Sequence, residues 1–396
     1  MSLIAEKLDQ AARLVAEQDL DVWLTFVRET AGHADPALAF LTDAGLTWES
    51  ALMVARDGRR VAVVGNYDAD PLKDSGNWHA VVPYVQGIRD ALVGALEDLV
   101  PASTNAPRIG VNWSEHNDKA DQLTVGMLRL LEGYLAGTRF AAGLVSAERV
   151  VGALRGRKTP AERDRIVRAI EETDRLFDEI ARDIARPGIT ERSIQDEIHR
   201  RIEARGLGFA WERSGDPIVN CGPDSMIGHG TPSDTLALAP GHILHIDLGV
   251  IRDGYASDLQ RCWYVGDSVP AAVERAFHTV HAAISAGATL LRPGIEGWRV
   301  DAAARAVLVD AGYPEYLHAL GHQVGRVAHD GGGLLGPRWD RYGDSPHQPV
   351  EVDQVYTLEL GIDVPGAGYL GIEEMVVVEP GGCRFLSRRQ DHVPLL

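Results

Sequence analysis

The sequence predicts an α+β protein with two parts, a smaller N-terminal α/β domain (residues 1–145) and a larger C-terminal domain (residues 146–396). The first part mixes strand-like and helical patterns. The second part contains a helix–helix–strands arrangement twice, which indicates an internal duplication. The 396 residues are 45% hydrophobic and 24% charged, a composition typical of a protein with a folded core.

The N-terminal elements follow from local patterns. Apolar spacing over residues 3–17 predicts a helix, and the run DVWLTFV predicts a strand. Residues 49–65 predict a hairpin, because an Asp-Gly turn separates two apolar runs. Helical patterns follow near residues 87–99 and 118–135.

In the C-terminal part, capping signals mark where helices begin. Thr159, Pro160 and Glu162 predict the start of one helix, and Thr190 predicts the start of a second after a Pro-Gly break. Strand-rich sequence follows up to residue 265. Helices near 270–291 and 297–312 and strands over 355–379 then repeat this order.

Charge and cysteine content restrict the class of function. The net charge of −18 repels phosphate backbones, so we expect no nucleic-acid partner. The three cysteines, Cys221, Cys262 and Cys383, form no CxxC pair and predict a reducing, cytoplasmic location. The first residues lack the apolar core of a signal peptide, and no apolar run is long enough to predict a membrane span.

A predicted hairpin over residues 243–265 carries two acidic side chains. Asp247 and Asp258 lie on the two sides of a turn at residues 252–254, so we expect them to face each other. Their Cβ atoms would then lie roughly 5 Å apart. The strands have an apolar, buried character, and two buried carboxylates need a compensating cation. The alternative is that both side chains face solvent.

A second hairpin repeats the arrangement. Glu359 and Glu373 are symmetric about Gly366 and should also be opposed. Glu374 should point to the other face of the sheet, because side chains alternate along a strand. A slip in register would exchange Glu373 and Glu374.

Three histidines, His318, His322 and His329, cluster in HALGHQVGRVAHD and provide a candidate imidazole ligand. An oxygen-rich set with an imidazole favours Mn²⁺, with Co²⁺ or Zn²⁺ as alternatives. Two ions bridged by carboxylates can activate water and polarise a carbonyl, so the pattern predicts hydrolysis.

The motifs DLG, SDLQR, GHQVG, LEL and IEE, in this order, resemble those of the pita-bread metallopeptidases. This family includes Xaa-Pro aminopeptidases, prolidases and methionine aminopeptidases, and the resemblance spans roughly residues 150–390. It implies a pita-bread (creatinase/aminopeptidase) fold. More loosely, the N-terminal part resembles the extra domain of the creatinase-like and proline-specific branches.

The resemblance assigns two divalent metal ions per subunit to five ligands. It implies that Asp247 chelates one ion, that Asp258 and Glu373 bridge both, and that His322 and Glu359 complete the second. Glu359 would also carry the proton of the attacking water.

Three further histidines receive roles from the resemblance. His229, in IGHGTP, matches a histidine that steadies the substrate or the leaving amine. His329 matches one that hydrogen-bonds the scissile carbonyl or the intermediate. His318 matches a substrate-pocket position.

The sequence also departs from the proline-specific members at several positions. Leu360 and Asp363 replace a usual Pro and Tyr, and Gly371 replaces a frequent Arg that helps to hold the substrate. Arg326, or an arginine of a partner subunit, is a candidate substitute. His245 should share the face of Asp247, either as a packed structural histidine or as a hydrogen-bond partner around the ligands.

We therefore predict a metallo-exopeptidase acting on short peptides, with Xaa-Pro dipeptides as the best substrate. A broader aminopeptidase or a carboxypeptidase is one alternative. A metal-free creatinase-like C–N hydrolase and a non-catalytic binding module are others, although retention of all five ligands argues against both. The resemblance also implies a homodimer.

Overall fold

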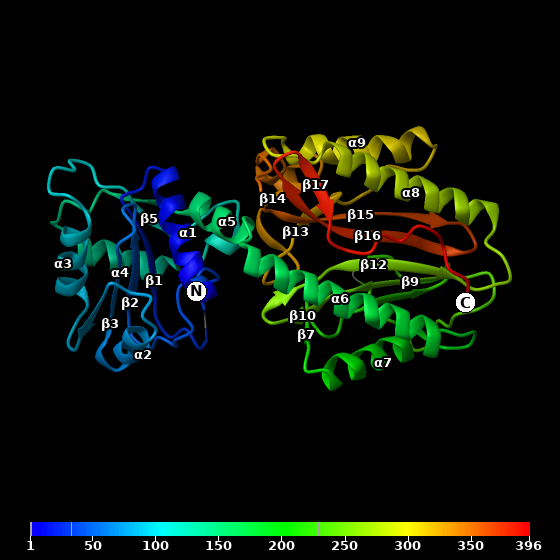
Figure 1. Ribbon diagram of the computed structural model, residues 1–396, viewed down its shortest axis with the longest axis horizontal. Helices are drawn as coiled ribbons and strands as arrows, with labels where there is room; N and C mark the ends of the chain where they lie inside the picture. Colours follow the sequence, from blue (N-terminus) through cyan, green and yellow to red (C-terminus); the bar gives the residue numbers. More distant parts are fainter. Residues whose placement is uncertain (1, 33, 229) are drawn as a thin grey trace. The chain divides into compact units, whose positions relative to one another are not determined.

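The chain folds into two compact units in the computed structural model, which describes residues 2–32, 34–228 and 230–396. The first unit is Met1–Arg155 and the second is Gly156–Leu396 (Figure 1). The division into functional domains at residues 145 and 146 remains a prediction. None of the helices in the described residues is both long and apolar enough to cross a membrane.

The first unit is a mixed sheet with helices on both faces. Its strand order is β4-β3-β2-β1-β5-β6. Apolar side chains on the two faces form two separate cores. The strands are β1 (Val22–Val27), β2 (Ser50–Ala55), β3 (Arg60–Gly65), β4 (Ala80–Tyr84), β5 (Ile109–Val111) and β6 (Leu144–Ser146). The helices are α1 (Leu3–Glu17), α2 (Ala69–Asp74), α3 (Arg89–Leu99), α4 (Val125–Leu135) and α5 (Glu148–Gly156).

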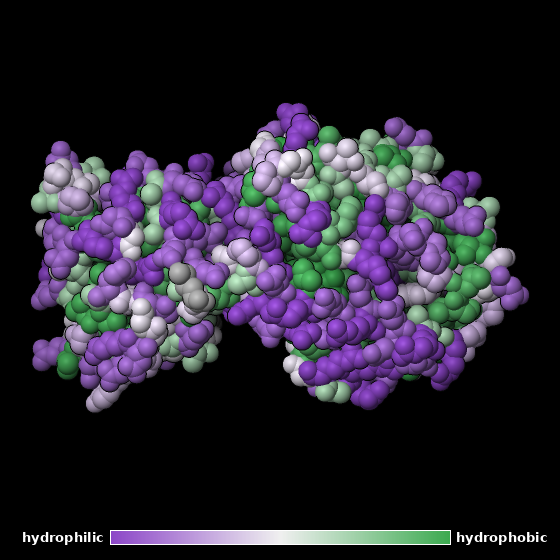
Figure 2. Space-filling view, in the orientation of Figure 1, coloured by the Kyte–Doolittle hydropathy of each residue, from purple (hydrophilic) through white to green (hydrophobic). Residues whose placement is uncertain are grey.

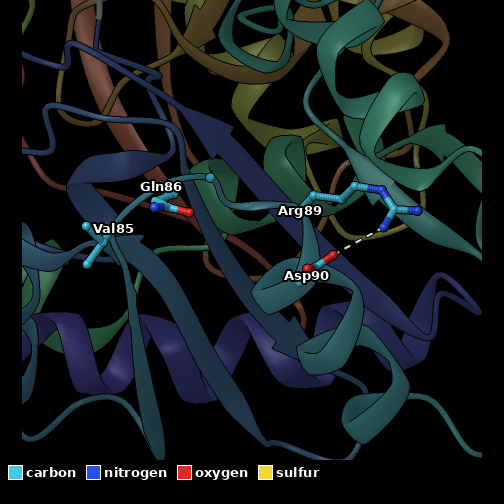
Figure 3. A pocket seen from close by; sticks show the side chains of 5 residues that line it. Val85, Gln86, Arg89 and Asp90 are labelled. Atoms are coloured by element: carbon cyan, nitrogen blue, oxygen red, sulfur yellow. Dashed lines mark hydrogen bonds and ion pairs between the residues drawn. The ribbon is translucent and has the colours of Figure 1, made fainter.

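The local signals of this unit are confirmed. Helix α1 begins after Ser2, whose hydroxyl accepts a hydrogen bond from the Ala5 amide at 3.2 Å. Strands β2 and β3 pair as the predicted hairpin, and Gly58 adopts the positive φ that its turn requires. A surface pocket lies before α3, where Arg89 pairs with Asp90 (Figure 3). It contains none of the predicted site residues.

The second unit contains the predicted duplication. The first half consists of α6 (Pro160–Asp183), α7 (Glu191–Ala204), β7 (Gly208–Phe209), β8 (Ile218–Cys221), β9 (Ile243–Leu248), β10 (Val250–Arg252), β11 (Tyr255–Ala256) and β12 (Leu259–Tyr264). The second half consists of α8 (Ala271–Leu290), α9 (Gly297–Asp310), β13 (Gly321–Gln323), β14 (Asp330–Leu335), β15 (Val355–Val364), β16 (Gly368–Glu379) and β17 (Gly382–Phe385). In both halves, two helices precede the strands on which they pack.

The two halves share one large sheet, in which β14-β13-β15-β16-β12-β9-β8 lie side by side and β17 pairs with β16. Helix α6 packs on the first half through Phe177 against Trp263, and α8 packs on β15 and β16 (Figure 1). Hydrophilic side chains cover α6 and α7 on the solvent side (Figure 2). One face of the sheet is thus covered by helices, which leaves the other face for a site.

Capping explains where α6 begins. The Thr159 hydroxyl accepts from the Glu162 amide at 3.3 Å, and the Glu162 carboxylate accepts from the Thr159 amide at 2.7 Å. Pro160 occupies the first helical position. The predicted capping box is therefore confirmed.

An ion-pair network secures the helix-facing side of the sheet. Arg261 donates to the Glu374 carboxylate at 3.2 Å and to the Glu373 carbonyl at 2.8 Å. The Ser387 hydroxyl and the Gln390 amide also donate to Glu374, at 2.5 and 2.9 Å. Because Glu374 is only 1% exposed, its charge depends on these partners.

We predict that Arg261→Met lowers the free energy of unfolding by about 3–5 kcal/mol, because it leaves the buried Glu374 carboxylate without its cationic partner. Urea denaturation of the metal-free protein measures the effect. The double variant Arg261→Met/Glu374→Met should recover much of the loss. A loss below about 1 kcal/mol in the single variant would contradict this interpretation.

Candidate metal centre

Side chains from both halves of the sheet converge on the face opposite the helices. Strand β9 carries the first, the segment before β12 the second, and β13, β15 and β16 the others. In chain order they are Asp247, Asp258, His322, Glu359 and Glu373. The structure therefore brings together the five side chains that the sequence singled out.

The second hairpin has the predicted register. Glu359 and Glu373 are direct cross-strand partners in the β15–β16 ladder. Glu374 pairs with Leu358 on the other face, where it meets Arg261. The pairing confirms that Glu373, and not Glu374, shares the face of Glu359, and its role as a ligand stays a prediction.

The first hairpin differs from the expectation. Asp247 faces Gln260, and Asp258 lies just before the regular β9–β12 ladder, which begins at Leu259 opposite Leu248. The reason is the turn, which is formed by Asp253 and Gly254, both with positive φ, and is therefore centred one residue later than expected. Asp247 and Asp258 still lie close enough for the charge of Asp247 to raise the pKa of Asp258.

His322 stands between carboxylates of both hairpins. Its Nε2 lies 3.7 Å from Asp258 Oδ2 and 3.4 Å from Glu359 Oε1. One ligand atom each from Asp258, His322 and Glu373 falls within 4.8 Å of the others. Glu359 is 20% exposed and Glu373 only 1%, so the cluster is closed at Glu373 and open beside Glu359.

Polar atoms of this cluster lack partners among the described residues. Both carboxylate oxygens of Glu373 and Oδ1 of Asp247 are buried without a hydrogen bond. The amide of Gln260 lies opposite Glu373 but donates to Glu359 Oε2, at 3.1 Å. Buried carboxylate oxygens rarely remain unsatisfied, so this donor set fits a divalent cation.

Burial and mutual repulsion perturb the carboxylates strongly. Burial raises the pKa of Asp247 to about 7. Burial and the charge of Asp247 raise the pKa of Glu359 to about 8, and the pKa values of Asp258 and Glu373 rise well above their usual range. Burial lowers the pKa of His322 to about 3, which keeps the imidazole neutral and able to bind a metal.

The other predicted histidines have different surroundings. The His329 ring contacts the His322 ring edge-to-face with centroids 4.2 Å apart, so His329 borders the cluster. His318 is exposed, and its ring lies beside the Tyr316 ring with centroids 5.7 Å apart. His229 lies outside the described residues.

Two positions that depart from the resemblance, Asp363 and Gly371, lie on the site-facing side of β15 and β16, whereas Leu360 packs into the core on the other face. A Cβ at Gly371 would lie 2.6 Å from His245 Nε2, so no larger side chain fits there. Asp363 is exposed and pairs with Tyr369, whose hydroxyl lies over Gly361. The guanidinium carbon of Arg326 lies 5.5 Å from the centre of the Tyr255 ring.

Sequence reasoning missed several neighbours of the cluster. Gln260 shares the alternating face of Asp258, which was an available signal. Tyr369 and Tyr316 form a hydrogen-bonded pair near the carboxylates, and burial raises the pKa of both phenols. Asp216 accepts from the Ala210 and Gly249 amides and was not marked by any motif.

Comparison with known proteins identifies the family. The model of metallopeptidase family M24 matches residues 164–380. The chain belongs to this family. The predictions of a metallo-exopeptidase, a hydrolase, and of the pita-bread fold are thereby confirmed.

Individual relatives agree with this membership. An Xaa-Pro dipeptidase of Lactobacillus helveticus is 30% identical over 70% of this chain and 71% of its own length. An uncharacterized peptidase of Staphylococcus saprophyticus is 30% identical over 61% of this chain, which spans 65% of that protein. The crystal structure of dipeptidase PepE from Mycobacterium ulcerans matches with a TM-score of 0.73 and 26% identity over 99% of this chain and 98% of its own.

We predict that Asp247→Asn stabilises the metal-free M24 protein at pH 8 but not at pH 5. A buried carboxyl with a raised pKa contributes stability below its ordinary pKa and loses it as pH rises through about 7, whereas an amide does not titrate. A stabilisation of about 1 kcal/mol by this substitution would raise Tm by ~2–4 °C in a unit of this size.

Thermal unfolding with a chelator at pH 5 to 8 measures this difference. With saturating Mn²⁺ the order should reverse, because only the wild type keeps the full ligand set. If Mn²⁺ stabilised the wild type and Asp247→Asn equally, Asp247 would not be a ligand of the metal centre.

Proposed function

We propose that this chain is a dinuclear metal-dependent peptidase of short peptides, with Xaa-Pro dipeptides as the preferred substrates. The observation that carries the proposal is the set of buried, unpartnered carboxylate oxygens beside the neutral imidazole of His322. The 30% identity with an Xaa-Pro dipeptidase supports the substrate class.

In this proposal the five side chains of the centre hold two divalent ions, with Mn²⁺ favoured over Co²⁺ or Zn²⁺. Bound ions would supply Lewis-acid polarisation of the scissile carbonyl and activation of the attacking water. We further propose a cytoplasmic location and a homodimer. Size-exclusion chromatography with light scattering would test the homodimer.

The side chains divide the remaining work. Glu359, at the open side of the cluster, accepts the proton of the attacking water and passes it to the leaving amine. Gln260 holds the other carboxylate oxygen of Glu359 in place. In the same proposal His329, which borders the cluster, hydrogen-bonds the substrate carbonyl, and His318 and His229 belong to the substrate pocket.

A second candidate, an aminopeptidase of longer peptides, is favoured by one observation. The wall at Gly371 is filled by His245 and Tyr369, which are neutral groups. A dipeptide needs a partner for its free carboxylate, whereas a longer peptide extends beyond the wall.

We predict that Glu359→Gln lowers kcat by about 10²–10⁴-fold, because the amide cannot accept the proton. Glu379→Gln is a matched control on the same hairpin, since Glu379 pairs with Arg384 at the surface, and it should retain activity. Mass spectrometry of a Mn²⁺-supplemented panel of Xaa-Pro dipeptides and longer Xaa-Pro peptides gives both rate and specificity.

The panel separates the candidates. Cleavage of the dipeptides supports the prolidase-like function, and trimming of longer peptides alone supports the aminopeptidase. Hydrolysis that survives Glu359→Gln would refute the assigned role of Glu359.

A further inference from the structure

A chain of hydrogen bonds links side chains on the three strands β9, β12 and β15 beside the metal centre, and Asn220 on β8 borders its first member. Asn220 Oδ1 on β8 lies 3.0 Å from His245 Nδ1 on β9. His245 Nε2 lies 3.0 Å from Gln260 Oε1 on β12, and Gln260 Nε2 donates to Glu359 Oε2 on β15 at 3.1 Å. The path ends on a carboxylate at the open side of the centre.

The polarity of this chain is set at the Glu359 end. A carboxylate only accepts, so the Gln260 amide must turn its NH₂ group to Glu359 and its oxygen to His245. His245 Nε2 then donates to that oxygen. Because burial lowers the pKa of His245 to about 4, the imidazole is neutral and Nδ1 carries no proton, so the chain of hydrogen bonds starts at His245 and not at Asn220. A side chain without a donor at this place would let the Gln260 amide rotate and release Glu359.

Gly371 makes the path possible. Strand β16 lies between β12 and β15, so a side chain there would block the crossing. A Cβ at Gly371 would lie 2.6 Å from His245 Nε2 and 2.7 Å from Gln260 Oε1, at the contact between them. The glycine and the histidine are therefore complementary features of this chain.

Packing holds His245 in its orientation. The residue is 3% exposed, and the Tyr369 ring meets it edge-to-face with centroids 4.9 Å apart. A buried imidazole with a fixed ring and fixed partners keeps one orientation of the Gln260 amide.

We propose that His245 is a positioning residue that acts through Gln260 to hold the Glu359 carboxylate in its working orientation. The proposal rests on the proposed function of Glu359. It explains why His245 and Gly371 occur together, and it assigns a role to Gln260, the fourth residue of the SDLQR motif.

Two isosteric replacements test the proposal. His245→Gln places an amide NH₂ near the position of Nε2 and keeps the donor to Gln260, whereas His245→Asn reaches only the Nδ1 position. We expect His245→Asn to lower kcat about 10- to 100-fold with little change in KM, and His245→Gln to retain most of the activity.

The visible absorption spectrum of the Co²⁺-loaded protein gives a readout independent of turnover, because it reports ligand geometry. It should change in His245→Asn and stay close to wild type in His245→Gln. Gly371→Ala should change it too, while Gly381→Ala, at a glycine with open space around it, should not.

The outcomes separate the two proposals. A wild type that neither binds Co²⁺ nor cleaves peptides would refute the proposed function. An active wild type whose Asn and Gln variants share one kcat and one spectrum would refute the role of His245. If the His245 variants do not fold, an unchanged Co²⁺ spectrum in Gly371→Ala would refute it as well.

Discussion

Repulsion among four buried carboxyl groups is the constraint on which the second unit of the structure depends. Burial raises the pKa of Asp247, Asp258, Glu359 and Glu373, and the charge of Asp247 raises the pKa of the other three further. Glu373 is almost fully buried. Removing such charges from water costs several kcal/mol each unless a cation compensates. The free energy that holds them together before a cation binds must therefore come from elsewhere in the fold.

That free energy comes from the opposite face of the sheet. Leu358 and Leu360, the neighbours of Glu359, pack into the apolar core under α8. Glu374, the neighbour of Glu373, is held by Arg261. Because side chains alternate along a strand, each buried partner on the helix side fixes the direction of a ligand on the other. The packed face and the site are thus determined by the same register.

The parts that could be predicted from sequence are those with local causes. Helix α6 begins where its capping box lies, and the β15–β16 hairpin is symmetric about Gly366 as its sequence indicates. In the first hairpin the turn lies one residue later than the sequence predicts. Each residue of β9 therefore pairs with a residue two positions later than expected, so that Asp247 faces Gln260 and not Asp258. A shift of two keeps each side chain on its face, so Asp247 and Asp258 still meet at the centre.

The parts that could not be predicted depend on strand order. Gln260 and Glu359 are 99 residues apart, and only the sequence of strands β12-β16-β15 brings them within hydrogen-bonding distance. From the family resemblance, Gly371 could be recognised only as a position where proline-specific members often have an arginine. The resemblance did not indicate that the His245 side chain, on a strand two positions away in the sheet, occupies the space beside Gly371.

The same arrangement bears on what a substrate meets beside the centre. Along β15 and β16 the site-facing pairs are Glu359 with Glu373, Gly361 with Gly371, and Asp363 with Tyr369. Tyr369 covers the first glycine and His245 the second, so the wall is aromatic and neutral at these two glycines, with the exposed Asp363 at its end. We infer that it suits the apolar ring of a prolyl residue, which packs well on an aromatic surface, better than a free carboxylate. Selection between dipeptides and longer peptides then falls to groups beyond this wall.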